Sequence, residues 1–333
     1  MTELVATTPG LYPLPDRAKD ELRALKGNQK EDLVDGAEDA ETVQTYETVR
    51  EDLIERQTRA GLDRVVEGQG RWDDMLAHPL AVHDSVETRG IVRYYDNNNF
   101  YREPVVTGEL TPDGDVAAEV AAATGHTESP LQAVLPGPYS LADLATDEQY
   151  GDEAAFLNAV AEFLAGEAAR SPEVETLFLL EPSLVTDPPE TDDGHERVPA
   201  ALDTVAAAVD AEVVVYPYWG ALVEKLYAHV MDADIDALGF DLVSAPDANV
   251  SNAQAYGTPA DVALGVVDGQ NTRVESAETV RERVDWFDDR TPQNQYDRVY
   301  ATLNTEAFYL PVNRFQEKLT ALGAATRPRE VEV

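Results

Sequence analysis

Apolar residues recur along this chain in two alternating patterns: short continuous runs, and longer runs with helical spacing. Eight short runs have the length and the β-branched content of buried strands: Leu4–Thr8, Asp63–Glu67, Leu131–Leu135, Thr176–Leu180, Val213–Tyr218, Ala237–Val243, Val262–Asp268 and Val299–Asn304. Near-continuous apolar strands are typical of a parallel sheet that is covered on both faces. The stretch from Val213 to Ser276 shows the pattern most clearly, because three of these strands lie within it.

Segments with helical spacing separate these strands. The clearest are Asp16–Gly27, Asp32–Gly61, Leu141–Ala169, Val198–Val209, Ala221–Met231, Ser276–Asp288 and Asn313–Ala324, whereas Asp115–Ala123 is ambiguous and Thr186–Glu196 has the composition of a polar loop. Eight alternating units in 333 residues predict a TIM-type (β/α)8 barrel, with residues 1–333 forming a single domain. A doubly wound open sheet is the alternative.

The region after the second strand interrupts this alternation. Ile91–Tyr95 and Pro104–Val106 are β-prone, and the sequence DNNNFYRE lies between them. A run of Asn with flanking aromatic residues favours a turn or an irregular hairpin. We therefore expect an Asn-rich β insertion above the sheet, with Asn98 among its residues.

The composition narrows the possible partners. Lys and Arg total 25 against 64 Asp and Glu, a formal net charge of -39. This charge repels phosphate backbones and anionic lipid, which argues against nucleic-acid and membrane-surface binding. The acidic residues are spread over the whole chain, as in a solvated halophilic surface that works at high salt. A disordered acidic chain is the alternative, but 43% hydrophobic residues and clear periodicity speak against it.

The chain has no cysteine, which excludes disulfides, thiolate metal sites and cysteine nucleophiles. Its first ten residues lack the basic and apolar regions of a signal peptide, and no apolar run is long enough to span a bilayer. These features predict a cytoplasmic protein.

Ligands of parallel barrels bind at the carboxyl ends of the strands. The polar residues expected there are Gln69, Glu181, Tyr216, Tyr218, Asp241, Asp268 and Glu306. The carboxylates among them could form a site for a hard cation or, as weak candidates, carry catalysis: Glu181, Asp241 and Asp268. The five histidines follow no strand directly and have no metal-binding spacing, so we interpret them as surface or loop residues.

Two further segments could bind a ligand. In GQGRWDDM, which follows the second strand, Trp72 could stack on a flat ring, and Asp73 or Asp74 could accept its hydrogen bonds; the alternative is a helix start with a core Trp. Arg93 precedes the Asn-rich segment and could bind a carboxylate, or could pair with a nearby acidic residue.

Several ordered motifs resemble the barrel of cobalamin-independent methionine synthase. They include RYYDNNNFYREP, LQAVLPGPYSLADL, TLFLLEPSL, VVVYPYWG, DALGFDLVSAP, ALGVVDGQNTR and RVYATLNTEAFYLP, and the resemblance covers nearly the whole chain. Members of this family have two similar barrels. The carboxy-terminal barrel holds zinc and homocysteine, and the amino-terminal barrel contacts the glutamate tail of the folate. This chain is most similar to the amino-terminal barrel.

Compared with the family, this chain has different residues at the positions that bind zinc and homocysteine. The positions of the family's zinc ligands correspond to Tyr216, Tyr218, Asp241 and Ala307, and the pair that binds the homocysteine amine corresponds to Gln69 and Leu180. Tyrosine is not a usual zinc ligand and alanine is none. The resemblance therefore implies no cofactor bound by this chain, with zinc held only in a partner chain.

The resemblance implies a division of labour with a separate zinc-bearing barrel chain. Arg93 corresponds to the basic residue that meets the glutamate tail, and Arg17, Lys19 and Arg23 are rough equivalents of a basic cluster near the first helix. The expected function is binding of a methyl-tetrahydrofolate-like donor; a pterin variant or a methyl-corrinoid stays open. The alternatives are a non-catalytic scaffold for the partner barrel, and an independent methyltransferase or lyase that uses strand-end carboxylates.

Overall fold

The computed structural model describes residues 2–22, 38–72, 74–95, 99–292 and 295–327. Seven parallel strands form one curved sheet in the order β1-β10-β9-β8-β7-β6-β4. They are β1 (Glu3–Ala6), β4 (Gln132–Pro136), β6 (Thr176–Leu180), β7 (Glu212–Tyr216), β8 (Ala237–Asp241), β9 (Asp261–Val267) and β10 (Arg298–Leu303). All residues of β4, β6, β8 and β9 are buried, as expected of strands with helices outside and side chains within.

The segment around Val65 closes the sheet into a barrel. The amides of Asp63 and Arg64 donate to the carbonyl of Ala6 on β1, at 2.9 and 3.2 Å. On its other side Val65 forms an isolated parallel bridge with Leu131, next to β4. The predicted strand Asp63–Glu67 is therefore present only as this bridge, and the predicted (β/α)8 barrel is confirmed.

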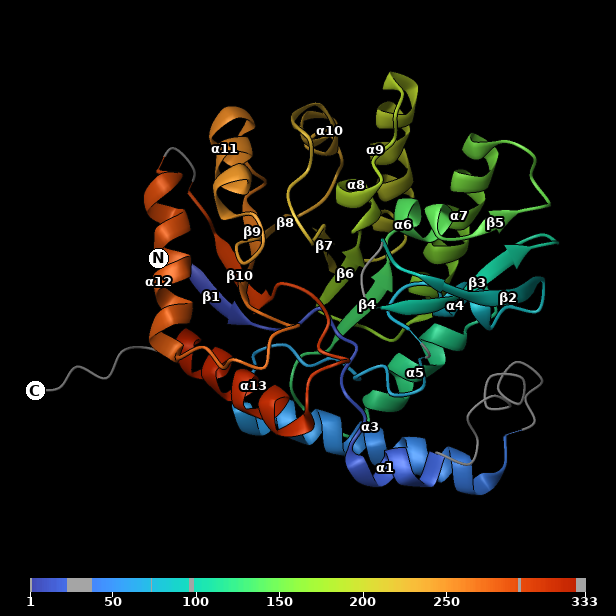
Figure 1. The fold of residues 1–333 in the computed structure, drawn as a ribbon, viewed down its shortest axis with the longest axis horizontal. Coiled ribbons are helices and arrows are strands. Elements are labelled where there is room, and N and C mark those ends of the chain that lie inside the picture. Colours follow the sequence, from blue (N-terminus) through green and yellow to red (C-terminus); the bar gives the residue numbers. More distant parts are fainter. Residues whose placement is uncertain (1, 23–37, 73, 96–98, 293–294, 328–333) are drawn as a thin grey trace, which may run out of the picture.

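Helices surround the barrel (Figure 1). They are α1 (Asp16–Glu21), α3 (Ala40–Ala60), α4 (His78–Ala81), α5 (Asp115–Ala123), α6 (Pro138–Asp143), α7 (Glu153–Arg170), α8 (Ser183–Thr186), α9 (Asp192–Ala206), α10 (Glu224–Val230), α11 (Pro246–Tyr256), α12 (Ala277–Arg290) and α13 (Val312–Thr326). The ambiguous segment is thus the helix α5. The long helix α3 begins at a cap in which the Asp39 carboxylate accepts from the amide of Thr42, and ends at Gly61 in the left-handed region.

One helix prediction and one loop prediction were wrong. Leu141–Ala169 is not one helix: α6 ends at Asp143, a two-residue strand β5 (Thr146–Asp147) follows, and α7 begins only after Asp152. The Asp147 carboxylate accepts from the amides of Gln149, Tyr150 and Gly151, which holds the intervening turn. The polar stretch Thr186–Glu196 is not all loop, because Thr191 caps α9 by accepting from the amide of Gly194.

A hairpin projects from the barrel where the Asn-rich insertion was expected (Figure 1). Its strands β2 (Val86–Arg93) and β3 (Phe100–Val106) are antiparallel, and β3 pairs with β5 at its base. Asp96, Asn97 and Asn98, which lie between the two strands in the sequence, are outside the described residues.

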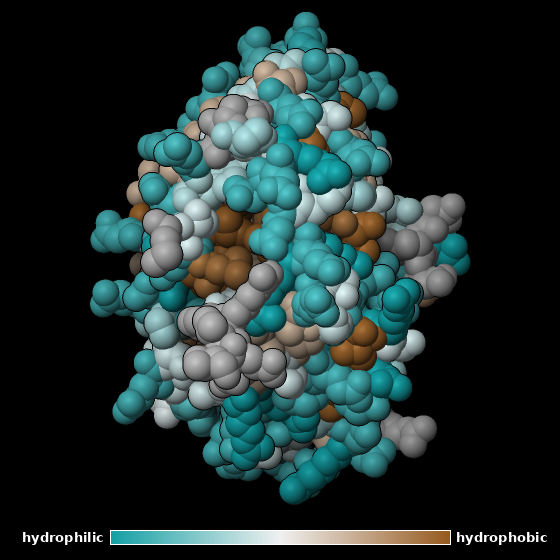
Figure 2. All heavy atoms as spheres, turned by 90° about the vertical axis from the view of Figure 1, so that its left-hand side faces the viewer, coloured by the Kyte–Doolittle hydropathy of each residue, from teal (hydrophilic) through white to brown (hydrophobic). Residues whose placement is uncertain are grey.

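The surface is largely hydrophilic, with scattered apolar patches on the face drawn in Figure 2, in keeping with the net charge of -39. No helix among the described residues is long and apolar enough to cross a membrane.

Candidate functional site at the carboxyl ends of the strands

Tyr216 and Tyr218 lie where β7 ends, and both side chains are fully buried. The Tyr216 hydroxyl donates to the carbonyl of Leu303, at the end of β10, at 2.7 Å. The Tyr218 hydroxyl contacts the Met75 sulfur at 3.4 Å. Burial raises the pKa of both phenols well above the ordinary value, and nearby carboxylates act in the same direction. Both tyrosines are therefore neutral, and Tyr216 is committed to a hydrogen bond across the barrel.

Asp241, at the end of β8, is a buried carboxylate held by donors from several loops. One oxygen accepts from the amides of Val243 and Ser244 at 3.0 and 2.8 Å, and the other from the amide of Trp219 at 3.1 Å. The Asn304 amide group reaches both oxygens at 3.2 and 3.3 Å. Burial raises the pKa of Asp241, and these hydrogen bonds oppose that rise. The carboxylate thus fixes the loops after β7 and β8.

Glu181 follows β6 and lies at the start of α6. Its carboxylate accepts from the amides of Tyr139 and Ser140 at 3.0 and 2.8 Å, and from the Ser140 hydroxyl at 2.7 Å. Burial raises the pKa of Glu181 to about 7, against the effect of these bonds. A Cβ at Gly137 would clash with this carboxylate, so the glycine of the PGPYS segment makes room for it.

Glu306 follows β10 and connects the barrel to the projecting hairpin. Its carboxylate accepts from the Asn99 side-chain amide at 3.1 Å and from the Thr305 hydroxyl. Burial raises the pKa of Glu306 to about 7 as well. None of Glu181, Asp241 and Glu306 forms an ion pair with a basic side chain of the described residues.

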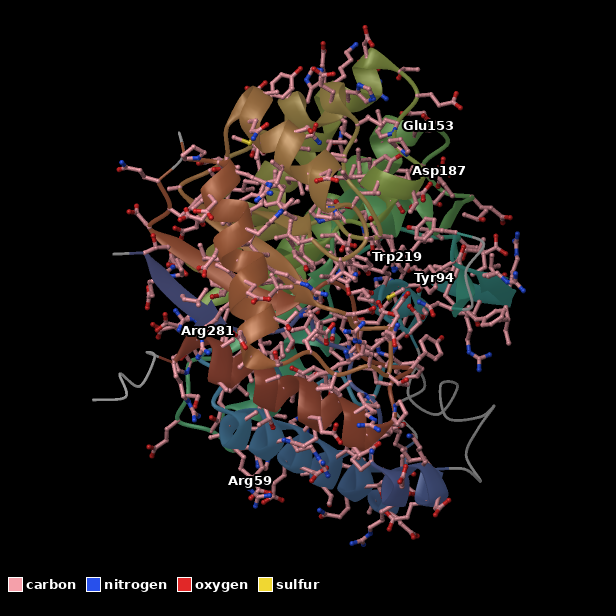
Figure 3. All side chains as sticks on the ribbon, turned by 60° about the vertical axis from the view of Figure 1, so that its left-hand side comes forward. Arg59, Tyr94, Glu153, Asp187, Trp219 and Arg281 are labelled. Atoms are coloured by element: carbon pink, nitrogen blue, oxygen red, sulfur yellow. The ribbon has the colours of Figure 1, made fainter. Side chains whose placement is uncertain are left out.

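Aromatic side chains from the hairpin and from the end of β7 meet at this end of the barrel. The ring of Trp219 makes edge contacts with Tyr218 at 4.9 Å and with Tyr95 at 5.2 Å, measured between centroids. Tyr94 donates to an oxygen of Asp74 at 2.5 Å, and Figure 3 shows Tyr94 and Trp219 close to each other. The indole nitrogen of Trp219 is buried and has no hydrogen-bond partner among the described residues.

Four residues other than glycine have positive φ, among the described part of the chain: Leu11, Gln69, Tyr95 and Trp219. Leu11 and Gln69 are linked by a hydrogen bond from the Leu11 amide to the Gln69 side chain at 2.6 Å, in the loops after β1 and after the Val65 segment. Trp219 and Tyr95, with φ of 67° and 41°, are in ring contact. A bulky residue in this region is strained, and such residues cluster at functional sites. The strain therefore marks the carboxyl-terminal mouth of the barrel as the candidate site.

The other residues singled out in the sequence lie elsewhere or serve local structure. Asp268 caps a turn by accepting from the amides of Gln270 and Asn271. Trp72 is buried and stacks on the His78 ring at 5.0 Å, and the Asp74 oxygen bonded by Tyr94 also accepts from the amides of Leu76 and Ala77.

The predicted tail-binding residues do not gather at one point of the described structure. Arg93 is exposed on the hairpin, with its guanidinium 5.6 Å from the Phe100 ring centroid. Arg17 and Lys19 lie on α1 and pair with Glu21 and Asp16 of the same helix. Arg23, Asn98 and Asp73 lie outside the described residues.

Sequence reasoning missed the aromatic part of the site. Tyr94, Tyr95 and Trp219 were not proposed as site residues, although RYYDN and YPYWG place paired aromatics beside predicted loops. Asn304, which holds Asp241, was also missed; the signal for it is its position directly after the last strand.

The donors present do not fit a zinc ion. Of the four positions that the resemblance equates with zinc ligands, Tyr216 and Tyr218 are neutral phenols, Asp241 already accepts bonds from two loops and Asn304, and Ala307 has no donor. No group of three or more His, Cys, Asp or Glu placed to hold a metal ion is found in the described part of the chain. Zinc is usually held by nitrogen, thiolate or carboxylate ligands, and these four positions do not offer such a set.

Fold and site together define a (β/α)8 barrel protein with a polar, aromatic mouth at the carboxyl ends of its strands. The family model described as "Cobalamin-independent synthase, Catalytic domain" matches residues 4–301. The chain belongs to the cobalamin-independent methionine synthase family, which confirms the resemblance and places the chain in methionine biosynthesis. The matching model is that of the catalytic domain, whereas the motifs had pointed to the amino-terminal barrel.

Similar proteins agree with this assignment. A methionine synthase of Sulfolobus acidocaldarius is 23% identical over 292 residues, which are 85% of this chain and 80% of that protein. One of Saccharolobus solfataricus is 24% identical, covering 83% of this chain and 81% of its own length. Among solved structures, a B12-independent methionine synthase from Shewanella sp. W3-18-1 in complex with selenomethionine has a TM-score of 0.77 at 18% identity, covering 97% and 96% of the two chains.

Proposed function

We propose that this chain binds the methyl donor in a two-chain methionine synthase, and that a separate zinc-bearing barrel chain binds homocysteine. The observation that carries the proposal is the occupation of the expected zinc positions by Tyr216, Tyr218 and Asp241, whose polar atoms are engaged in bonds within this chain. A thiol needs a metal or a cationic neighbour to become a reactive thiolate near neutral pH. The three buried carboxylates at this mouth disfavour the negative charge of a thiolate.

The mouth retains features that suit a flat donor. Trp219 and Tyr95 offer aromatic faces, and the buried indole nitrogen of Trp219 is a hydrogen-bond donor for a ligand carbonyl or ring nitrogen. We propose a methyl-tetrahydrofolate-like donor whose ring meets these aromatic residues, with Arg93 at the edge for its carboxylates. Trp72, Tyr216 and Tyr218 would then support the mouth from within, and Asp74 would do so through Tyr94.

The two alternatives make different demands on the same residues. An independent enzyme would need a carboxylate free to move protons, and Glu181, Asp241 and Asp268 all accept backbone amides in caps or turns. A pure scaffold for the partner barrel would need no aromatic mouth. Neither alternative accounts for two strained aromatic residues in contact there.

Calorimetric titration of the purified chain with triglutamyl 5-methyltetrahydrofolate tests donor binding. We expect binding without added zinc, and a loss of about tenfold in affinity for Trp219→Ala, since an aromatic contact contributes about 1 kcal/mol beyond area burial. Trp286→Ala is the matched control, because that residue lies on α12 with its ring against Arg290. No binding at any donor concentration would contradict the proposal.

Turnover tests the division of labour. Methionine should form from homocysteine only when a zinc-bearing barrel of the same family is added. Stoichiometric zinc in the chain purified alone, or methionine formation by the chain alone, would overturn the two-chain arrangement.

A further inference from the structure

His195 on α9 has a buried ring nitrogen without a hydrogen-bond partner. The residue is 8% exposed, and its Nε2 lies 2.7 Å from the carbonyl oxygen of Pro189. A carbonyl oxygen can only accept a hydrogen bond, so Nε2 carries the proton of the neutral ring and Nδ1 keeps its lone pair. Nδ1 is buried and has no partner among the described residues. Buried polar atoms are normally satisfied by a partner, so this lone pair is available for a ligand.

A second imidazole lies beside His195. His229 is on α10, which packs against α9 (Figure 1). The centroids of the two rings are 5.9 Å apart, and the ring planes are inclined at 50°. The His229 side chain is partly exposed and forms no hydrogen bond with a residue of the described chain. Two imidazoles from neighbouring helices thus meet, and neither is saturated with hydrogen bonds.

The spacing of the two rings suits coordination of one metal ion. A bond of about 2.0–2.1 Å between metal and nitrogen puts the ring centre about 3.2 Å from the ion, so two imidazoles at tetrahedral positions have centroids about 5.2 Å apart. The distance of 5.9 Å exceeds this value by about 0.7 Å. A small rotation of His229 about its side-chain bonds closes the difference, because no hydrogen bond to a described residue holds its ring.

The bond to Pro189 holds His195 in the tautomer that a metal ligand needs. A metal-binding histidine usually donates its other ring N–H to a backbone carbonyl or a carboxylate, which fixes the ring and leaves the ligating nitrogen free. The loop that carries Pro189 is closely packed, because a Cβ at Gly194 would come within 2.8 Å of the Pro189 side chain. His195 is therefore arranged to bind through Nδ1 before any ion arrives.

A carboxylate supplies negative charge next to the two rings. Asp192, in the first turn of α9, forms an ion pair with Lys225, which lies one turn before His229 on α10. The pKa of Asp192 is lowered, mainly by Lys225 and to a smaller extent by His195 and His229. Asp192 therefore lies within electrostatic reach of both imidazoles and can offset part of the charge of a divalent ion without being a ligand.

We propose that His195 and His229 together bind one divalent ion of a late first-row transition metal, namely Cu²⁺, Ni²⁺ or Zn²⁺, with water completing the coordination. Imidazole nitrogen suits these ions, whereas Mg²⁺ and Ca²⁺ prefer oxygen ligands. Within this group Cu²⁺ should bind most tightly. The described chain has no group of three or more such ligands, so this is a two-ligand site that links the start of α9 to α10.

Calorimetric titration of the full chain with Cu²⁺ or Ni²⁺ tests the proposal. Excess Mg²⁺ is present throughout, because it occupies carboxylates of the acidic surface. We expect saturable binding of one ion per chain. His229→Asn should lower the affinity by at least about tenfold, since it removes a ligand. The matched control is His126→Asn, because His126 lies 2.6 Å from Glu47 at another place and should leave the affinity unchanged.

The pH dependence and the spectrum of the Cu²⁺ complex give independent measurements. Both imidazoles must be neutral to bind, so the affinity should fall at least about tenfold from about pH 7.5 to about pH 5.5. The electron paramagnetic resonance spectrum of the wild-type complex should show coupling to two nitrogens. A spectrum without nitrogen coupling overturns the proposal, as does equal affinity of the wild type and His229→Asn.

This site is independent of the proposed function, because it uses no residue of the barrel mouth. Zinc content separates the two proposals. Zinc that is bound by the wild type and lost in His229→Asn belongs to the pair of histidines. Zinc that His229→Asn retains in stoichiometric amount lies elsewhere and counts against the two-chain arrangement instead.

Discussion

The ring of Tyr216 lies against the backbone of Gly239 on the neighbouring strand, so closely that a Cβ on Gly239 would collide with it. On the next strand, a Cβ at Gly265 would come within 2.5 Å of the Tyr216 hydroxyl oxygen. Tyr216 thus fills the top of the barrel because two strands carry glycine there. The position that the resemblance equates with a zinc ligand is occupied by a packed ring.

Gly239→Ala should destabilise the protein. The added methyl group forces the Tyr216 ring or its backbone to shift, and overpacking of this kind costs about 1–3 kcal/mol. The measurement is the free energy of unfolding from denaturant titration. Gly90→Ala on the hairpin is the control, because no atom lies within 4 Å of a Cβ there, and we expect a change within about 0.5 kcal/mol. Equal effects of the two substitutions would contradict the close packing of Tyr216.

Ionisation of Glu306 should lower the stability of the protein as the pH rises from about 4.3 to about 7. Its pKa of about 7 in the folded protein lies above the unfolded value of about 4.3. The folded state therefore binds this proton more tightly, and stability falls between these two pH values.

Glu306→Gln should remove that slope and gain about 1–3 kcal/mol relative to the wild type between pH 5 and pH 8. The exposed Glu317→Gln on α13 should leave the slope unchanged. Parallel stability curves for wild type and Glu306→Gln would refute the raised pKa.

Arg50 should contribute far more to stability than Arg59, although both lie on α3. Arg50 is buried among Glu47, Glu67 and Glu119, and burial raises the pKa of Glu67 to about 8 despite this neighbour. Removing a buried partner leaves uncompensated carboxylates and costs about 3–5 kcal/mol, so Arg50→Met should lower the free energy of unfolding by that amount. Arg59, exposed beside Glu55, should cost at most about 1 kcal/mol when replaced in the same way. The reverse order would show that the buried network carries no stability.

Salt should stabilise the fold. A net charge of -39 destabilises the compact state through self-repulsion, which is screened as the Debye length falls from about 10 Å at 0.1 M to about 3 Å at 1 M. We expect the thermal midpoint to rise with KCl over this range. A midpoint that is flat or falls with salt would contradict the prediction of a halophilic surface.

The barrel could be predicted from the sequence because its strands are buried on both sides, which leaves continuous apolar runs. Thr176–Leu180 was predicted with the same bounds as β6. The extent of the second strand was predicted wrongly, because only Val65 of Asp63–Glu67 pairs there as a bridge. The glycines at positions 61 and 68, on either side of it, have positive φ. The break between α6 and α7 depends on amides that turn around Asp147, which leaves little trace in hydrophobic periodicity.

The candidate site could be predicted only in part. Position along the strands identified Tyr216, Tyr218, Asp241 and Glu181, since parallel strands end on one face. Their bonding could not be predicted, because Tyr216 reaches Leu303 over 87 positions and Tyr95 reaches Ser183 over 88. Contacts between such distant residues depend on how the hairpin folds back, which no local pattern encodes.

The barrel has few backbone hydrogen bonds at the segment around Val65, and this affects where local unfolding of the sheet begins. Elsewhere neighbouring strands are joined by two or more paired residues, but the segment between β1 and β4 is held by the amides of Asp63 and Arg64 on the β1 side and by the single bridge of Val65 to Leu131 on the other. Local openings start where fewest bonds must break together. The Val65 amide should therefore exchange with deuterium sooner than the Leu264 amide in β9. The barrel should open first between β1 and β4.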